Sequence, residues 1–173
     1  MNENIFEPLK MKNTFAYMVT DIRRINNKDL AIGHTYENGK FEYAHLQPKY
    51  NFVFYLGDFY GDGSCVTTAR DLMIWDDALK NCSILPCNIQ NETITPQKMN
   101  DSTIFIRDNI SYGFGWFIKN TASGKLVYHS SGHPGNSHVI YRLLDKDITF
   151  IFLSNAETVN LKALRNKILL LLN

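Results

Sequence analysis

Nucleophilic side chains are the first candidates for chemistry in this sequence. Cys65 follows Ser64 in Gly61-Asp-Gly-Ser-Cys, but a reactive thiol needs a base within reach, which the sequence alone does not supply. The Gly-x-Ser-x-Gly pattern of a nucleophile elbow is not completed at Ser64, so a role in the turn and in capping the next helix is favoured. Cys82 and Cys87 flank Ser-Ile-Leu-Pro and could pair, although an odd cysteine count favours two free thiols near a turn.

Histidines and paired carboxylates are the other candidates. The five histidines show no metal-ligand spacing, and no glycine-rich phosphate loop is present, so we expect no metal and no cofactor. Asp76-Asp77 is interpreted as a solvated helix face rather than a catalytic pair. His129 lies in a strand-like run, where the pattern alone favours a histidine satisfied by a backbone carbonyl. His133 and His138 are interpreted as loop and strand-surface residues.

Length and composition limit the kinds of protein that can position such residues. The 173 residues suffice for one domain with a buried core but are short for two. A chain that is 45% hydrophobic and 13% aromatic is not a disordered tail, a collagen-like chain or a coiled coil. The net charge of +1 gives no support to nucleic-acid binding or to a polybasic membrane anchor. Without a signal peptide or an apolar run of about 20 residues, we expect a soluble globular chain with no membrane span.

The first half of the chain predicts a hairpin and an aromatic segment. Residues 30–36 and 40–45 have the pattern of strands on either side of Asn38-Gly39, the strongest short hairpin signal. Residues 51–60 are rich in aromatic side chains and predict a strand or loop that closes into a tight turn.

One helix is predicted in the middle of the chain. Leucine and tryptophan recur at helical spacing over residues 67–81, with Thr67 or Thr68 as the N-terminal cap. Residues 81–109 are polar and contain two prolines, so they are interpreted as a loop with one short helix around residues 96–100.

The end of the chain predicts an antiparallel sheet and a final helix. The strand-like runs are residues 112–118, 126–129, 138–144 and 148–153. Their short connections imply antiparallel neighbours. Residues 159–172 repeat leucine and isoleucine at helical spacing, with Thr158 as the predicted cap. We therefore expect an α+β fold in which a C-terminal antiparallel sheet is covered by the terminal helix, after a loop-rich, partly helical region.

Five segments match, in order, the patterns of one enzyme family. They are Pro8–Thr14 (with Lys10 where the pattern has glycine), Leu30–His34, Gly61–Trp75, Tyr112–Trp116 and His129–Gly135. Leu153-Ser154-Asn155 follows them as a closing strand. Together they resemble the C-terminal half of the serine β-lactamase-related family, which includes class C β-lactamases, penicillin-binding proteins, D-alanyl-D-alanine carboxypeptidases and esterase-like relatives. The resemblance implies the β-lactamase/transpeptidase-like fold.

The resemblance also implies acyl-enzyme chemistry on an amide or ester. Family members use Ser-x-x-Lys and Tyr-x-Asn, together with a Lys- or His-led triplet on a core strand. Here the triplet is His129-Ser130-Ser131, with His129 as hydrogen-bond donor or proton partner and the Gly132 amide as an oxyanion-hole donor. The resemblance thus suggests His129, Ser131 and Gly132 as catalytic residues, and His129, Ser130 and Gly132 as substrate-binding residues. Ser131 stands where the family usually has glycine, and an alternative register places the triplet at His133-Pro134-Gly135.

The nucleophile motif is missing from this chain. No serine has lysine three places on, and both early family motifs precede the segment that here begins at Pro8. We therefore expect a single partial domain, with a helical and loop region and a hairpin in residues 1–110 and the strands and last helix in residues 111–173. The chain is expected to be inactive alone. The alternatives are a catalytically silent binding or interaction domain that keeps the fold, and a decayed remnant without function.

The resemblance also suggests partners. A completed protein is expected to act on a small-molecule or peptide-like substrate, with no role for nucleic acid. Because N-terminal strands pair with the C-terminal sheet in the family, their absence predicts an unpaired edge and an exposed apolar patch. We therefore expect self-association or pairing with a missing N-terminal portion. Family members usually act outside the cytoplasm, whereas this chain shows no export signal.

Overall fold

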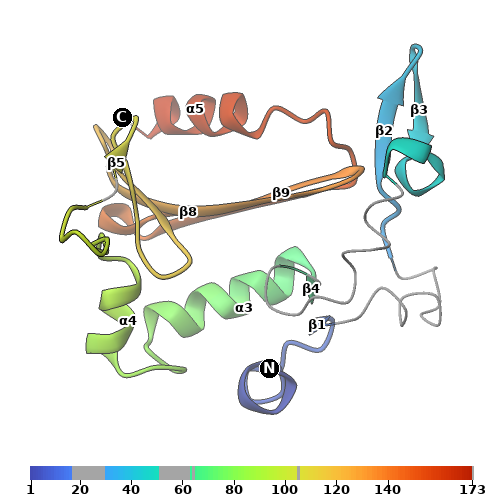
Figure 1. Ribbon diagram of the computed structural model, residues 1–173. Coiled ribbons are helices and arrows are strands. Elements are labelled where there is room, and N and C mark those ends of the chain that lie inside the picture. The colour runs from blue at the N-terminus through green and yellow to red at the C-terminus, as the bar shows by residue number, and fades with distance from the viewer. Residues whose placement is uncertain (17–29, 51–62, 64, 105, 173) are drawn as a thin grey trace. The chain divides into compact units, whose positions relative to one another are not determined.

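A computed structural model describes residues 1–16, 30–50, 63, 65–104 and 106–172 of the chain (Figure 1). The aromatic segment predicted at residues 51–60 lies outside these residues. The chain divides into two units, which are described separately. The hairpin unit comprises Met1–Trp75, Gly132–His138 and Leu153–Val159, and the sheet unit comprises Asp76–Ser131, Val139–Phe152 and Asn160–Asn173. The prediction of a single partial domain stays a prediction.

A six-stranded sheet has the strand order β10-β9-β8-β7-β6-β5. The strands are β5 (Ile106–Arg107), β6 (Ile110–Tyr112), β7 (Phe117–Thr121), β8 (Gly124–His133), β9 (Asn136–Leu143) and β10 (Ile148–Ser154). Neighbouring strands are consecutive in the chain and joined by short turns, so the sheet is antiparallel. The predicted C-terminal sheet is confirmed. The single run predicted at residues 112–118 is instead two strands, because Gly115 takes a φ of +79° and turns the chain between them.

Aromatic side chains form a row across this sheet. Tyr112 lies opposite Phe117, and Phe117 lies opposite Tyr128, so the three share one face. Ring centroids in the row are 4.9 Å apart for Tyr112 and Phe117, and 5.3 Å for Phe117 and Tyr128. Tyr141 and Phe150 continue it on β9 and β10, at 5.3 and 5.1 Å. Tyr128 and Tyr141 of the row belong to the core cluster of this unit, and Phe117 and Phe150 pack against it.

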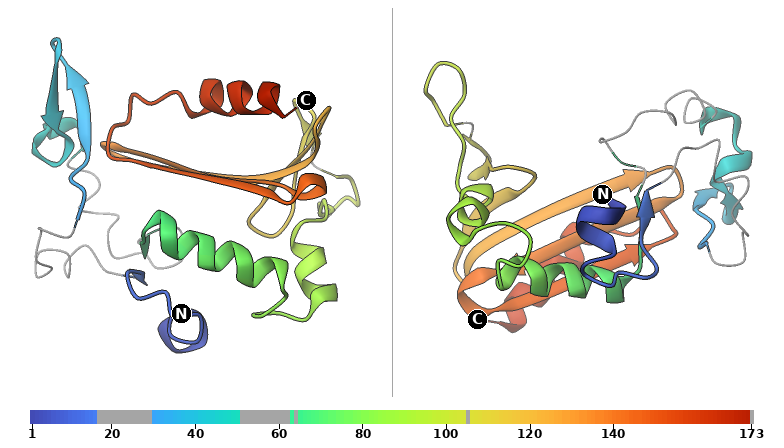
Figure 2. Two further views of the ribbon diagram at one scale, coloured as in Figure 1. Left: turned by 180° about the vertical axis from the view of Figure 1, so that it is seen from behind. Right: turned by 90° about the horizontal axis from the view of Figure 1, so that it is seen from below.

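The terminal helix covers one face of the sheet, as predicted. Helix α5 (Leu161–Leu171) packs Leu161 and Leu169 against the core cluster. Its cap is Asn160, whose Oδ1 accepts from the Ala163 amide at 2.9 Å, so the prediction of Thr158 as the cap was wrong. Helix α4 and the end of α3 lie on the opposite side of the sheet (Figures 1 and 2).

Helices α3 (Ala69–Lys80) and α4 (Cys87–Thr93) account for the middle of the chain. The predicted helix over 67–81 is confirmed, and Thr68 caps it by accepting from the Asp71 amide at 3.1 Å. The short helix expected around residues 96–100 was wrong, because the helix begins directly after Pro86. Proline fixes its own φ and needs no amide partner at a helix start, which explains the placement.

Asp76 is a buried ion-pair residue rather than part of a solvated face. Its side chain is fully buried, and its Oδ1 lies 2.5 Å from Nε of Arg142 on β9. Lys80 lies 3.1 Å from the other carboxylate oxygen and 2.9 Å from Asp147. The prediction of a solvated pair was therefore wrong for Asp76, although Asp77 is exposed. The error arose because Arg142 is distant in the sequence.

The cysteines between α3 and α4 form a disulfide. The sulfur atoms of Cys82 and Cys87 are 2.10 Å apart, so the interpretation as free thiols was wrong. Cys82 takes a φ of +52° just after α3, which turns the chain back and brings the two Cα atoms to 5.1 Å. Cys65 is free and exposed.

The predicted hairpin forms in the hairpin unit. Strands β2 (His34–Glu37) and β3 (Lys40–Tyr43) pair around Asn38 and Gly39, whose φ angles are +49° and +84°. Two consecutive positive φ values are the signature of the tight turn that Asn-Gly favours. The remaining elements are η1 (Asn2–Phe6), β1 (Phe15–Ala16), η3 (Ala44–Leu46), η4 (Pro48–Tyr50), β4 (Cys65–Val66), which pairs with β1, and η5 (Leu144–Lys146) of the sheet unit. Within the described ranges, no helix has the length and apolar character needed to cross a bilayer.

Candidate active site

His129 on β8 lies against Phe117 of the neighbouring strand β7 and Tyr112 of β6, the strand beyond it. Its Nε2 is 3.4 Å from the Tyr112 hydroxyl, and its ring stacks on Phe117 with centroids 5.5 Å apart. The partners of the imidazole are therefore aromatic side chains rather than the backbone carbonyl that the sequence pattern favours. The Tyr112 hydroxyl at Nε2 and the Phe117 ring against its face restrict how the imidazole can turn. The other ring nitrogen, Nδ1, therefore has a defined direction.

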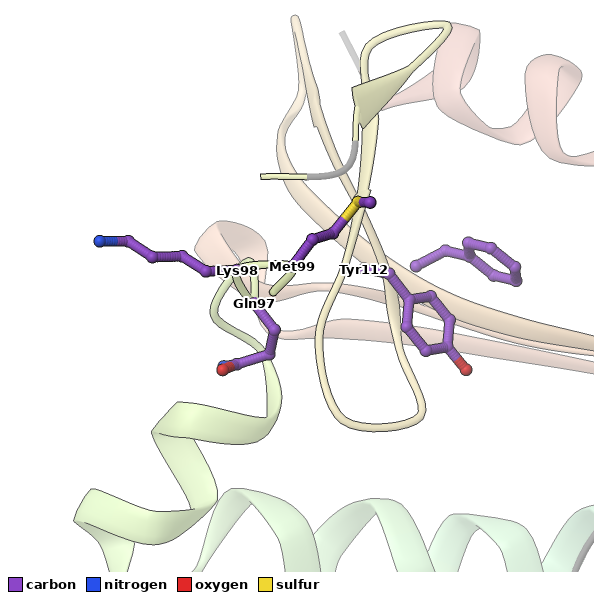
Figure 3. Close-up of a pocket in the computed structure, with 5 residues that line it drawn as sticks. Gln97, Lys98, Met99 and Tyr112 are labelled. Atoms are coloured by element: carbon purple, nitrogen blue, oxygen red, sulfur yellow. The ribbon is translucent and has the colours of Figure 1, made fainter. Parts of the chain in front are cut away.

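A cavity of about 430 Å³ lies next to the two aromatic side chains that contact this imidazole. It is lined by Gln97, Lys98, Met99, Tyr112 and Phe117 (Figure 3). Tyr112 and Phe117 also contact His129. The Lys98 and Met99 side chains extend in opposite directions (Figure 3). The volume lies within the range of about 300–1,000 Å³ that is typical of small-molecule sites.

The end of α4 fixes the strand that carries Tyr112. The Gln97 amide donates to the Tyr112 carbonyl at 2.9 Å, and the Phe114 amide donates to the Thr93 carbonyl at 2.9 Å. A Cβ on Gly113 would lie 2.1 Å from the Thr93 oxygen, so only glycine permits this approach. Gly113, the first glycine of the matched segment Tyr112–Trp116, thus lets the chain take the position that brings Tyr112 to the cavity wall.

The other predicted site residues follow His129 along β8. Ser130, Ser131, Gly132 and His133 are all exposed. Because side chains alternate along a strand, Ser131 shares a face with His129 and Ser130 faces the other way. Among the residues that the structure describes, and apart from its two chain neighbours, no atom lies within 4 Å of the position that a Cβ on Gly132 would take. Among these predicted residues, His129 is the one whose side chain contacts the cavity wall in the described part of the chain.

Within the hairpin unit, a carboxylate holds the turn between β8 and β9. Glu157 accepts from the Gly135 amide at 3.1 Å, from the Tyr50 hydroxyl at 2.8 and 2.7 Å, and from the Thr35 hydroxyl. We call Thr35, Tyr50, Gly135 and Glu157 the carboxylate knot. Burial acts to raise the pKa of Glu157, but the hydrogen bonds from Thr35, Tyr50 and Gly135 outweigh it and lower the pKa below its usual value.

Sequence reasoning missed Glu157, and only its place just after Asn155 could have drawn attention to it. The residues that it joins are more than 100 positions away in two cases, with sequence separations of 122 for Thr35 and 107 for Tyr50. No local pattern connects such residues.

Two glycines from different matched segments meet beside the knot. Gly135 takes a φ of +77°, and a Cβ there would lie 2.4 Å from the Gly33 carbonyl carbon. The His34 amide donates to the carbonyls of Gly135 and Asn155 at 2.9 and 2.8 Å, and Asn155 donates from Nδ2 to the Ile32 carbonyl at 3.0 Å. Three of the segments singled out in the sequence therefore meet at one point in the hairpin unit.

Lys10 stands where the first matched segment of the family has glycine, and its backbone has a conformation that glycine favours. Lys10 takes a φ of +59°, a left-handed conformation that costs an L-residue about 1–2 kcal/mol. It ends the first turn of chain, where the Met11 amide donates to the Phe6 carbonyl at 2.9 Å.

The letters Tyr-x-Asn occur once, at Tyr36-Glu37-Asn38, but not at their family position. There they form the turn between β2 and β3, and Tyr36 packs edge-on against Phe41 with centroids 5.1 Å apart. Their role is to close the hairpin. In the part of the chain that the structure describes, no three His, Cys, Asp or Glu side chains gather as a metal site.

The sequence matches the family described as Beta-lactamase over residues 1–172. The chain belongs to this Beta-lactamase family. Penicillin-binding protein 4* of Bacillus subtilis (strain 168) is 31% identical over 161 residues, which are 89% of this chain and 34% of that protein. The chain thus spans about a third of that curated relative.

Solved structures of penicillin-binding protein homologues share the fold of this chain. The octameric penicillin-binding protein homologue of Pyrococcus abyssi superimposes with a TM-score of 0.69 at 22% identity, over 90% of this chain and 33% of that one. FmtA of Staphylococcus aureus gives a TM-score of 0.66 at 20% identity, over 96% of this chain and 42% of that one. The β-lactamase/transpeptidase-like fold expected from the sequence is confirmed, and the chain covers part of it.

Proposed function

We propose that this Beta-lactamase family chain supplies one wall of a serine acyl-transfer cleft. The observation that carries the proposal is the imidazole of His129, held by Tyr112 and Phe117 at the rim of a cavity of about 430 Å³. The attacking hydroxyl comes from outside this sequence, which holds no Ser-x-x-Lys. The chain alone is therefore inactive.

The reaction is the acyl transfer that this family catalyses on an amide or ester. The serine oxygen forms a bond to the carbonyl carbon and loses its proton, while the bond to the leaving nitrogen or oxygen breaks and that atom gains a proton. Water then attacks the acyl-enzyme, releases the acid and restores the serine hydroxyl. His129 donates a hydrogen bond or a proton beside the reacting group, and the Gly132 amide stabilises the oxyanion. Ser130 and Ser131 line the strand along which the substrate binds.

A chimera with Penicillin-binding protein 4* tests this proposal. This chain replaces the matching third of that protein, which supplies the remaining two thirds, and the product is exposed to a fluorescent penicillin. We expect the chimera to be labelled and the isolated chain to remain unlabelled. A folded chimera that is never labelled would contradict the proposal and favour the catalytically silent binding domain. Circular dichroism and a cooperative thermal transition establish that the chimera is folded.

The missing portion is also the proposed partner of the sheet. Strand β10 is at one edge of the strand order, and among the described residues no strand pairs with its outer side. An unpaired edge offers backbone donors and acceptors to another chain. The isolated chain is therefore expected to self-associate as its concentration rises. A monomer at all concentrations in light scattering would contradict this.

A further inference from the structure

Three of the side chains that line the cavity are largely apolar. They are Met99, Tyr112 and Phe117, and Met99 is half-exposed at 50%. Lys98 contributes to the lining, but its side chain extends away from Met99 (Figure 3). A group that enters the cavity therefore meets two aromatic rings and a thioether.

The loop that carries Met99 is closed by its own hydrogen bonds. The Met99 amide donates to the Thr103 carbonyl at 2.7 Å, and the Ser102 amide donates back to the Met99 carbonyl at 2.9 Å. Lys98 and Ile104 form an antiparallel bridge at its base. The opposite wall, Tyr112 and Phe117, is fixed by strand pairing. Both walls exist before a ligand binds, so little ordering is needed on binding.

This lining favours large apolar groups over small ones. Aromatic rings associate edge-on or offset with other rings, and a methionine sulfur makes favourable contacts with a ring edge while adapting to its shape. A methyl group fills little of a cavity of about 430 Å³ and leaves its apolar lining in water.

We infer that this cavity is a selectivity pocket that binds an aromatic or large aliphatic side chain next to the scissile amide or ester bond. The position of that bond beside His129 rests on the proposed function, whereas the binding preference of the cavity does not. Met99, Tyr112 and Phe117 are the residues that determine the preference. The substrate class is an amide or ester of a compound with a bulky apolar side chain.

The binding preference is tested on the chain as it exists. N-acetyl-phenylalanine amide and N-acetyl-alanine amide, in both enantiomers, are titrated while the ring resonances of His129 and Tyr112 are followed by NMR. We expect at least one phenylalanine enantiomer to shift them at concentrations at least tenfold below either alanine compound. Met99→Ala weakens that binding severalfold, whereas Met73→Ala, at a methionine 40% exposed on α3, leaves it unchanged. Equal binding of both amides, or no effect of Met99→Ala, would overturn the inference.

A second arm separates this inference from the proposed function. The chimera is acylated with benzylpenicillin and with 6-aminopenicillanic acid, which lacks the aromatic side chain. Faster acylation by benzylpenicillin, reduced by Met99→Ala, supports the inference. Acylation at equal rates leaves the proposed function standing and overturns the pocket. No acylation by either compound contradicts the proposed function, while the NMR titration still decides the binding preference.

Discussion

The sheet unit and the hairpin unit hold their candidate residues by different means. In the sheet unit, apolar burial and the row of aromatic rings place His129 beside the cavity, and the strands involved are consecutive in the chain. In the hairpin unit, one carboxylate accepts hydrogen bonds from a hairpin, a short helix and a strand turn, across separations of up to 122 residues. Burial defines the first arrangement, and directed polar contacts define the second.

The comparison explains why the two units respond differently to mutation. In a row of stacked rings the van der Waals contacts are spread over many atoms, so each ring contributes only part of the stabilisation. The carboxylate knot depends on the single carboxylate of Glu157. Polar positions in either unit are therefore the sensitive points, and the size of the effect follows their burial.

The largest effect is expected at the buried ion pair of the sheet unit. Asp76→Ala leaves Arg142 buried and without its carboxylate, which costs about 3–5 kcal/mol of the free energy of unfolding. Asp77→Ala, one residue along on the exposed side of the same helix, costs less than about 0.5 kcal/mol. Urea unfolding followed by tryptophan fluorescence measures both. If the two variants lowered the free energy of unfolding equally, burial alone and not the ion pair would stabilise this unit.

A smaller effect is expected at the knot of the hairpin unit. Glu157→Gln removes the charge that strengthens the bonds from Gly135, Tyr50 and Thr35, and because Glu157 is only partly buried we expect a loss of about 1 kcal/mol. Glu37→Gln, in an exposed pair with Lys49 on the same unit, is the control and changes stability by less than about 0.5 kcal/mol.

The same substitution predicts a pH dependence. The pKa of Glu157 is lowered in the folded state, so its stabilising contribution is fully present above the unfolded pKa of about 4.3 and is lost as the pH falls through the folded pKa. The difference in Tm between the natural chain and Glu157→Gln should therefore be largest near neutral pH and should shrink below about pH 4. A difference that stays constant down to pH 3 would contradict this role for the carboxylate.

A modest gain is expected at Lys10. Lys10→Gly relieves the left-handed strain at a φ of +59°, and after the entropy cost of glycine in the unfolded chain we expect a gain of about 0.5 kcal/mol. Lys12→Gly, nearby and without a positive φ, is expected to lose a similar amount. Thermal unfolding compares the two variants. A loss at Lys10 equal to that at Lys12 would contradict the assignment of this position as a glycine site.

The same contrast explains what the sequence could predict. The β2–β3 hairpin, α3, the C-terminal strands and α5 follow from local signals: an Asn-Gly turn and apolar periodicity. The buried state of Asp76 and the role of Glu157 could not be predicted, because each depends on a partner far along the chain. The predictions of the α5 cap and of the position of α4 were wrong because several polar residues near each boundary could begin a helix.

The residues of the candidate site also divide into those that the sequence predicted and those that it did not. His129 was found because it lies within a matched segment, His129–Gly135, whose order relative to the other segments is informative. Its partners Tyr112 and Phe117 were not identified from the sequence, because a strand pattern does not show which side chains of other strands meet an imidazole. The glycines of the matched segments proved to be positions of close backbone approach, at Gly113 and Gly135.

The most direct test of the central claim is the effect of His129 on acylation of the chimera. The account predicts that His129→Ala lowers the rate of penicillin labelling by about 100-fold, the lower end of what a proton-transferring group contributes. His133→Ala, at an exposed histidine four residues further along β8, should leave the rate within about twofold. Loss of labelling at His133 with a normal rate at His129 would place the triplet in the alternative register. Normal rates in both variants would contradict the claim that this strand is a wall of the cleft.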